Sequence, residues 1–158
     1  SITLKGNPVN TSGNLPNVGD SAPALTLVRN DLSEIRGLSK FTGLFCDANG
    51  LQALEHRLAL VLEELFTNIV SYGYEDVNSH EINVQIKLDG GVLTAIIDDD
   101  GIPFDPQNAQ VAGTEGSVED RPVGGLGIHL VFTIVDAFNY ERVDGRNLTT
   151  VTMTVPEL

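Results

Sequence analysis

The chain has 158 residues, with nine Lys and Arg against 22 Asp and Glu, and its formal net charge is −13. Hydrophobic residues make up 41% of the sequence, which is enough for one domain with a sizeable core and excludes disorder on composition. This acidity excludes direct nucleic-acid binding and disfavours adsorption to an anionic membrane, and no apolar run reaches the roughly 18 residues of a membrane span. The single cysteine, Cys46, forbids an internal disulfide and is typical of a reducing compartment, so we expect a cytoplasmic protein.

The first 23 residues differ in composition from the rest. They are rich in Gly, Pro, Asn, Ser and Thr and have no periodic apolar face. This composition predicts turns and at most one hairpin, so we expect an amino-terminal appendage at 1–23 that extends the sheet or mediates dimerisation. The remaining residues, 24–158, are expected to form the main domain.

The main domain alternates helical and strand patterns. The patterns predict a strand at 24–28, helices at about 30–48 and 51–72, strands at 81–88 and 92–97, a helix at 126–135, and strands at 138–143 and 148–155. Antiparallel hairpins with helices between them predict an α+β fold, a two-layer sandwich whose mixed, mainly antiparallel sheet is covered on one face by helices. The segment 98–125 has no predicted element, and a loop of that length is usually functional.

The helix at 51–72 contains a candidate catalytic pair. Glu64 and Asn68 lie four residues apart and share one helix face, whereas Glu63 points elsewhere. A carboxylate one turn from a carboxamide can activate a hydroxyl or a water while the amide oxygen helps to hold Mg²⁺. A solvated helix face would explain the same spacing.

Three consecutive carboxylates, Asp98 to Asp100, follow the strand at 92–97 and precede Gly101. Their mutual repulsion requires a cation or hydrogen-bond donors. An EF-hand is excluded, because with Gly101 at loop position six the first and last ligand positions fall on Ile96 and Gln107. The remaining alternatives are a surface turn, or an aspartate at a strand end that binds a ligand amine.

A glycine cluster, Gly124-Gly125-Leu126-Gly127-Ile128, opens the apolar helix at 126–135. Free backbone N–H groups at a helix start form an anion site, and glycines allow close approach. The cluster is no P-loop, since no Lys follows it, and no dinucleotide fingerprint, since no strand precedes it. A plain turn before a helix is the alternative.

Together and in this order, the three clusters resemble the boxes of the Bergerat-fold (GHKL) ATPases, and most closely those of the bacterial anti-sigma-factor serine/threonine kinases. The segment 64–75 resembles the N box, 98–106 the first glycine box and 124–131 the second, and the likeness extends over about 24–156. It implies an ATP-binding kinase that transfers the γ-phosphoryl group of Mg·ATP to an antagonist (anti-anti-sigma) protein and thereby regulates a sigma factor. Whether the chain forms a homodimer stays open.

The resemblance also implies residue roles. Glu64 would be the general base and Asn68 the Mg²⁺ ligand, and Asp99 would accept the adenine amino group. The further nucleotide-binding residues that it implies are Gly101, Pro103, Gly124, Gly125, Leu126, Gly127, Ile128 and Thr149. Three positions depart from the family pattern: Pro103 replaces a glycine, Tyr72 stands where a histidine is frequent, and Leu148 replaces a glycine before Thr149.

Charge adds one candidate independently of the resemblance. Arg121 is the only Lys or Arg between Lys87 and Arg142, and it lies three residues before the glycine cluster. We therefore expect Arg121, together with Mg²⁺ and the helix start, to offset the negative charge of the phosphates. Residues 105–123, which include Arg121, are predicted to form a lid over the nucleotide. His129, inside the apolar helix, is expected to be packed rather than catalytic.

Three alternatives remain. The first is a nucleotide-dependent binding module that sequesters a partner without turnover. The second is a thiol peroxidase, because residues 2–23 resemble the amino-terminal segment of that family, although Cys46 has no second cysteine to resolve a sulfenate. The third is a sensor histidine kinase domain, which is disfavoured because no phosphoacceptor-histidine helix precedes the motifs in this sequence.

Overall fold

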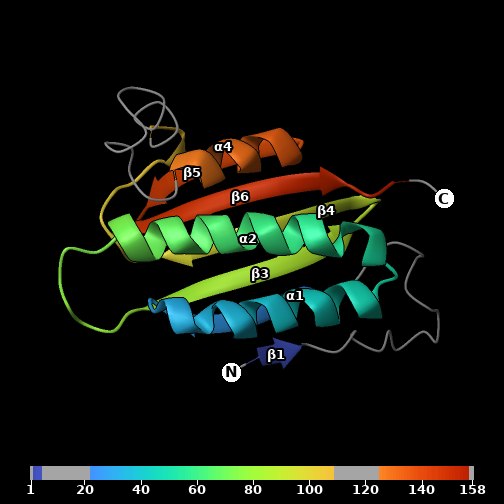
Figure 1. Ribbon diagram of the computed structural model, residues 1–158, viewed down its shortest axis with the longest axis horizontal. Coiled ribbons are helices and arrows are strands. Elements are labelled where there is room, and N and C mark those ends of the chain that lie inside the picture. The colour runs from blue at the N-terminus through green and yellow to red at the C-terminus, as the bar shows by residue number, and fades with distance from the viewer. Residues whose placement is uncertain (1, 5–21, 109–124, 157–158) are drawn as a thin grey trace.

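The computed structural model describes residues 2–4, 22–108 and 125–156, with side chains described over 22–108 and 127–156 (Figure 1). Most of the predicted appendage and most of the predicted lid lie outside these residues. Within the described part, no helix combines the length and the apolar character needed to cross a membrane.

Six strands form a single sheet in the order β1-β2-β3-β4-β6-β5. Their bounds are β1 Ile2–Leu4, β2 Ala24–Arg29, β3 Glu81–Asp89, β4 Val92–Asp99, β5 Ala137–Val143 and β6 Arg146–Thr154. Every described pairing is antiparallel, so the sheet that was expected to be mixed and mainly antiparallel has no parallel pair among these strands. β1 pairs with β2 and forms the edge of the sheet next to it.

The two hairpins turn at residues with positive φ. Gly90 and Gly91 connect β3 to β4 with φ of 57° and 78°, and Asp144 and Gly145 connect β5 to β6 with φ of 50° and 77°. Such left-handed turns match the twist of the strands that they join. Both turns lie where the sequence predicts them.

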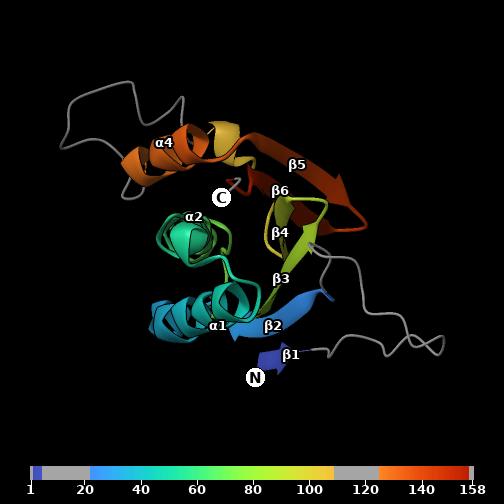
Figure 2. The same cartoon turned by 90° about the vertical axis from the view of Figure 1, so that its right-hand side faces the viewer.

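The helices cover one face of the sheet (Figure 2). They are the short 3₁₀ helix η1 (Leu32–Glu34), α1 (Ile35–Ala48), α2 (Gln52–Tyr72) and α4 (Gly125–Ile134). On β3 and β4 buried and less buried residues alternate, so one side of each strand packs under the helices. The predicted two-layer sandwich is confirmed, and no described helix covers the opposite face.

One end of the sandwich collects the predicted motifs. The end of α2, the end of β4 and the start of β6 all lie at the left of Figure 1. The β4–β6 register places Asp99 opposite Asn147 and Ile97 opposite Thr149. The first two motifs, distant in sequence, therefore meet beneath the end of one helix.

Candidate functional site

The second half of α2 presents Glu64 and Asn68 toward the sheet end. Glu64 is half-buried, and burial, followed by the nearby Glu63 carboxylate, raises the pKa of the Glu64 carboxyl group. Asn68 is only 1% exposed, and its Nδ2 donates to the Glu64 backbone oxygen over 2.8 Å. Its Oδ1 is buried and accepts no hydrogen bond from any described residue. A buried amide oxygen that accepts no hydrogen bond lowers the stability of the fold unless a ligand or an ion contacts it.

Gly127 on α4 lies directly against the Glu64 side chain. A Cβ built at Gly127 would come within 1.7 Å of Glu64 Oε2, so the Glu64 carboxylate would have to move if position 127 carried a side chain. The absence of a side chain therefore allows α4 to approach the carboxylate. This contact brings the second glycine motif to the candidate base.

At the end of β4, Asp99 is buried, with only 2% of its surface exposed. Its Oδ1 accepts the backbone N–H of Gly101 and the Nδ2 of Asn147, each over 2.9 Å. Burial raises the pKa of the Asp99 carboxyl group, and the two hydrogen bonds work against that rise. Neighbouring Asp98 and Asp100 raise it further.

Gly101 passes close to the end of α2. The N–H of Ile102 donates to the Gly73 carbonyl oxygen over 2.8 Å, and a Cβ at Gly101 would lie 2.4 Å from that oxygen. Any other residue at position 101 would push the segment after β4 away from α2. Glycine is therefore required here by close backbone approach to the end of α2.

Three of the predicted site residues, Asn68, Asp99 and Thr149, line one small cavity between α2 and the sheet. Its other lining residues are Leu65, Ile69, Gly73, Phe104, Pro106 and Asn147. The cavity has a volume of about 10 Å³, room for roughly one water molecule. Phe104, whose ring stacks on Tyr72 with centroids 6.0 Å apart, and the buried Pro106 close it from the loop side.

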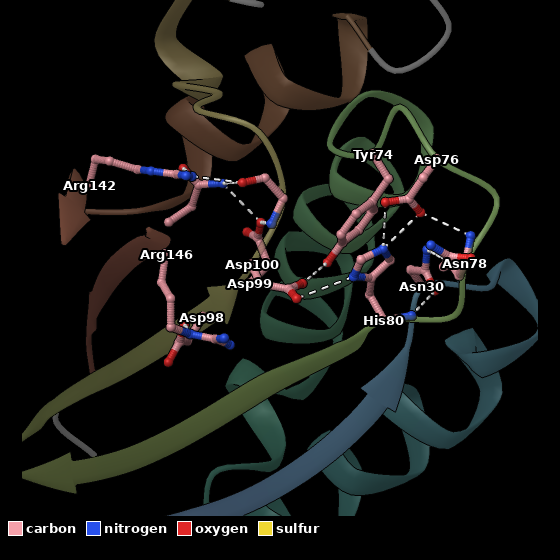
Figure 3. Close-up of polar contacts among 12 residues, drawn as sticks. Asn30, Tyr74, Asp76, Asn78, His80, Asp98, Asp99, Asp100, Arg142 and Arg146 are labelled. Carbon is pink, nitrogen blue, oxygen red and sulfur yellow. Dashed lines mark hydrogen bonds and ion pairs between the residues drawn. The ribbon is translucent and has the colours of Figure 1, made fainter. Parts of the chain in front are cut away.

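The two outer carboxylates of the Asp98 to Asp100 run do not line this cavity, and each has polar partners of its own (Figure 3). Asp98 Oδ1 pairs with Arg146 Nε over 2.5 Å. Asp100 accepts from the Tyr74 hydroxyl over 3.1 Å and contacts His80 Nδ1 over 3.2 Å. Only the middle carboxylate, that of Asp99, remains directed to the cavity.

His80 forms a cluster with these groups that the sequence did not predict. Its Nε2 lies 2.8 Å from Asp76 Oδ1, and its ring stacks on Tyr74 with centroids 4.3 Å apart. Hydrogen bonds to Asp76 and then to Asp100 raise the pKa of His80 above its ordinary value. An imidazolium that donates from both nitrogens satisfies both carboxylates.

This cluster predicts a pH-dependent stability. Because the folded-state pKa of His80 is raised, its contribution is full below the unfolded value of about 6.5 and is lost as pH rises through the folded pKa. We expect the difference in unfolding free energy between the wild type and His80→Gln to be larger at pH 5.5 than at pH 8.5, as measured by urea denaturation. Equal differences at both pH values would contradict the charged pairing.

The other predicted site residues that the structure describes do not line the cavity between α2 and the sheet. Gly125 opens α4, Ile128 is fully buried in the core, and Pro103 is exposed at the surface. Arg121, Gly124 and the side chain of Leu126 lie outside the described residues. The prediction for His129 was wrong: it is exposed, because Ile128 and Val131 occupy the face of α4 that packs on the core.

Asn147 is the buried polar residue that the sequence reasoning missed. It lies at the start of β6 with 2% of its surface exposed and contacts Asp99 directly. The alternation along β6 contains the signal, since Asn147, Thr149, Val151 and Met153 share the buried face. The predicted strand began one residue too late, at 148, to include it.

Cys46 is fully buried in α1, and burial, followed by Glu55 and Asp47, raises the pKa of its thiol to about 11. A buried, protonated thiol lacks the reactivity that a peroxidatic cysteine needs. Among the described residues, no group of three or more His, Cys, Asp and Glu side chains is arranged to hold a metal ion.

The antiparallel sandwich, with a long helix carrying Glu64 and Asn68 above a buried strand-end aspartate, has the architecture of the kinase-like ATPases. The sequence matches the family described as histidine kinase-like ATPase domain over residues 28–155, and the chain belongs to that family. The predicted kinship with the Bergerat-fold superfamily is thus confirmed.

Two relatives have names that agree with the predicted kinase class. Serine/threonine-protein kinase BtrW of Bordetella bronchiseptica is 30% identical over 105 residues, which cover 66% of this chain and 74% of the relative. Serine-protein kinase RsbW of Bacillus velezensis is 32% identical over 101 residues, and the match spans 61% of each chain.

Proposed function

We propose that this chain is an ATP-dependent serine/threonine protein kinase of the anti-sigma-factor type. It transfers the γ-phosphoryl group of Mg·ATP to a hydroxyl of an antagonist protein and thereby regulates a sigma factor. The observation that carries the proposal is the shared cavity, which is lined both by Asn68, whose buried Oδ1 has no partner among the described residues, and by the buried Asp99. Glu64 lies one helical turn before Asn68. The family and the names of both relatives support it.

Asp99 binds the adenine amino group in this proposal. A buried carboxylate that already accepts two N–H groups on one oxygen keeps its second oxygen for a ligand donor. Thr149, buried two residues beyond Asn147, lines the same cavity and adds a hydroxyl. The cavity as it stands holds no purine, so the segment with Phe104 and Pro106 must move when adenine binds.

The residues present fit a magnesium ion bound together with phosphates. Asn68 Oδ1 is a hard oxygen ligand of the kind that Mg²⁺ prefers, and it is buried without a donor. The Asn68 amide is also fixed in orientation, since its Nδ2 donates to the Glu64 carbonyl. When bound, Mg²⁺ would neutralise charge on the transferred phosphoryl group.

We expect ATP affinity to depend strongly on Mg²⁺, because the net charge of the chain is −13 and none of the described residues that line the cavity is a Lys or an Arg. Chelating Mg²⁺ should weaken ATP binding at least about tenfold in calorimetry, and Asn68→Leu should remove most of that difference. Ser71→Ala, an exposed change on the same helix, should retain the Mg²⁺ effect. A full Mg²⁺ effect in Asn68→Leu would exclude Asn68 as the ligand.

Glu64 orients or deprotonates the acceptor hydroxyl. Burial, followed by the Glu63 charge, raises the pKa of the Glu64 carboxyl group and so makes its carboxylate a stronger base, and the start of α4 lies against it through Gly127. N–H groups at that helix start favour phosphate oxygens, so the acceptor hydroxyl and the γ-phosphate would meet beside Glu64. Catalysis then depends on positioning and electrostatics.

The partners and the location are part of the same proposal. We place the kinase in the cytoplasm, where a single buried thiol stays reduced, with an antagonist protein and a sigma factor as partners. Residues 1–23 are assigned as an appendage, 24–158 as the ATPase domain and 105–123 as its lid. Homodimerisation can be measured by light scattering.

A non-catalytic binding module is the alternative function. To separate the two, proteins captured from the native cell by the chain are incubated with Mg·ATP, and their intact masses are measured. A kinase adds a phosphate to one captured protein, and the wild-type chain releases ADP. A module retains ATP unchanged and leaves every captured protein unmodified, which would overturn the kinase proposal.

A further inference from the structure

Resting on the proposed function, we infer that Asn147 is a positioning residue that sets purine specificity. It holds Asp99 as a hydrogen-bond acceptor toward the ligand, and thereby selects adenine, which donates from its amino group, over guanine, which presents a carbonyl oxygen.

The orientation of the Asn147 amide is fixed from both ends. Its Nδ2 donates to Asp99 Oδ1 over 2.9 Å and to the Ile102 carbonyl oxygen over 2.8 Å. Its Oδ1 accepts from Arg142 Nη1 over 3.0 Å and from the Tyr140 hydroxyl. A flipped amide would place oxygen against two acceptors and N–H groups against two donors, so only one orientation satisfies the network.

This orientation determines which oxygen of Asp99 faces the ligand. Asn147 and the Gly101 N–H both donate to Oδ1, and no described residue donates to Oδ2 in a hydrogen bond. Two N–H donors stabilise the ionised carboxylate against its burial. If a proton does bind, it binds to Oδ2, because Oδ1 is already occupied by two N–H groups.

A protonated Oδ2 would reverse the preference for purines. As an ionised acceptor, Oδ2 matches the amino group of adenine, whereas a protonated Oδ2 is a donor that matches the carbonyl oxygen of guanine. A site built around one buried hydrogen-bonding group rejects the purine that leaves this group unpaired. Asn147 therefore acts on specificity through Asp99.

Asn147 also connects the β5–β6 hairpin to the segment after β4. Arg142 Nη1 donates to the Gly101 carbonyl oxygen over 2.7 Å, and the Phe104 N–H donates to the Tyr140 hydroxyl over 3.2 Å. A purely structural role for Asn147 would thus weaken the binding of all nucleotides equally. A specificity role changes the ratio of their affinities.

The test compares ATP and GTP binding by calorimetry in the wild type, Asn147→Leu and Asn139→Leu. Asn139 is exposed on β5 of the same hairpin, and its substitution should leave both affinities unchanged. We expect Asn147→Leu to reduce the preference for ATP over GTP by about tenfold, the value of one discriminating hydrogen bond. An unchanged preference would overturn the inference.

The pH profile provides a second readout. The charged and titratable groups around Asp99 are Asp98 on its own strand, Asp100 directly after that strand, Tyr74 after α2, Arg142 on β5 and Arg146 on β6. The affinity for ATP is full at pH values above the pKa of Asp99 and is lost as the pH falls through that pKa. Without the Asn147 donor this loss should occur at higher pH than in the wild type, measured with the same ATP. An unshifted profile would also overturn the inference.

If Asn147→Leu does not fold, as judged by circular dichroism, Asn147→Asp is used, because it keeps the shape of the side chain and the acceptor for Arg142. Two adjacent carboxylates titrate as a coupled pair, one of them with a raised pKa, so the pH at which the ATP-to-GTP ratio changes should be higher than in the wild type. A constant ratio would overturn the inference.

The same series includes Asp99→Asn. If that variant binds ATP as the wild type does, the adenine assignment itself fails, and the inference fails with it. If Asp99→Asn binds ATP weakly while Asn147→Leu retains the wild-type preference and pH profile, only the inference about Asn147 fails.

Discussion

Replacing Glu64 with Gln should lower phosphoryl transfer by about 10²- to 10⁴-fold, the range expected when a general base is removed. The substitution keeps the volume of the side chain and its contact with Gly127, so α4 stays in place. It removes only the proton-accepting carboxylate, whose pKa is raised by burial and by the Glu63 charge. ATP affinity should not fall, because Glu64 does not line the cavity with Asp99 and the loss of its negative charge beside the γ-phosphate only relieves repulsion.

The matched control is Glu63→Gln on the same helix. Glu63 is exposed and points away from the site, yet its charge contributes to the raised pKa of Glu64. We expect transfer by Glu63→Gln to stay close to the wild-type rate, measured in single-turnover experiments with labelled ATP. Normal transfer by Glu64→Gln would show that the base assignment is wrong.

Asp99→Asn should weaken ATP binding by about 10- to 100-fold, which corresponds to one hydrogen bond to a charged group, about 1.5–3 kcal/mol. The loss arises because an amide presents one acceptor where the carboxylate presents two. Asp99 Oδ1 already accepts from Gly101 and Asn147. The amide then points an N–H group at the adenine amino group, and two donors face each other.

Asp98→Asn is the control for the loss of one negative charge at this sheet end. Asp98 pairs with Arg146 outside the cavity, so its replacement should change ATP affinity by less than about threefold, the effect of a partly exposed ion pair. Calorimetry at a fixed Mg²⁺ concentration measures both variants. An equal effect of the two substitutions would indicate general electrostatics and not adenine recognition.

Much of the fold could be predicted because its signals are local. The alternation along 81–88, the glycines at 90 and 91, and the apolar stripe of 51–72 each determine an element from neighbouring residues. The antiparallel order follows from the two hairpins. His129 shows the limit of this reasoning, since an apolar helix does not reveal from its sequence which side faces the core.

The compensation of Asp98, Asp99 and Asp100 could not be predicted. Their repulsion required donors or a cation, and the structure provides different partners from two distant segments, β6 and the loop after α2. Which residue meets which depends on the register of β4 and β6, where Asp99 lies opposite Asn147. A shift of one residue would have exchanged the inner and outer faces, and register is a property of the assembled sheet.

For the candidate site, the sequence indicates which residues share a helix face or a motif, but not what surrounds them in the fold. Spacing alone placed Glu64 and Asn68 on one face, but only packing shows that the amide oxygen of Asn68 is buried and unpartnered. Likewise, the resemblance implied that Gly101 binds the nucleotide, but not that its backbone lies against the carbonyl oxygen of Gly73. Residues that act through contacts with distant segments need the fold before their roles can be assigned.

The most direct test of the kinase assignment follows the γ-phosphoryl group itself. The chain is incubated with Mg·ATP labelled at the γ-phosphate and with a protein that it captures from the native cell, and the labelled product is treated with acid and with alkali. We predict label on the captured protein that resists acid and is released by alkali, as expected of a phosphorylated serine or threonine, and no label with Glu64→Gln. Acid-labile label on a histidine, or label that persists with Glu64→Gln, would contradict the assignment.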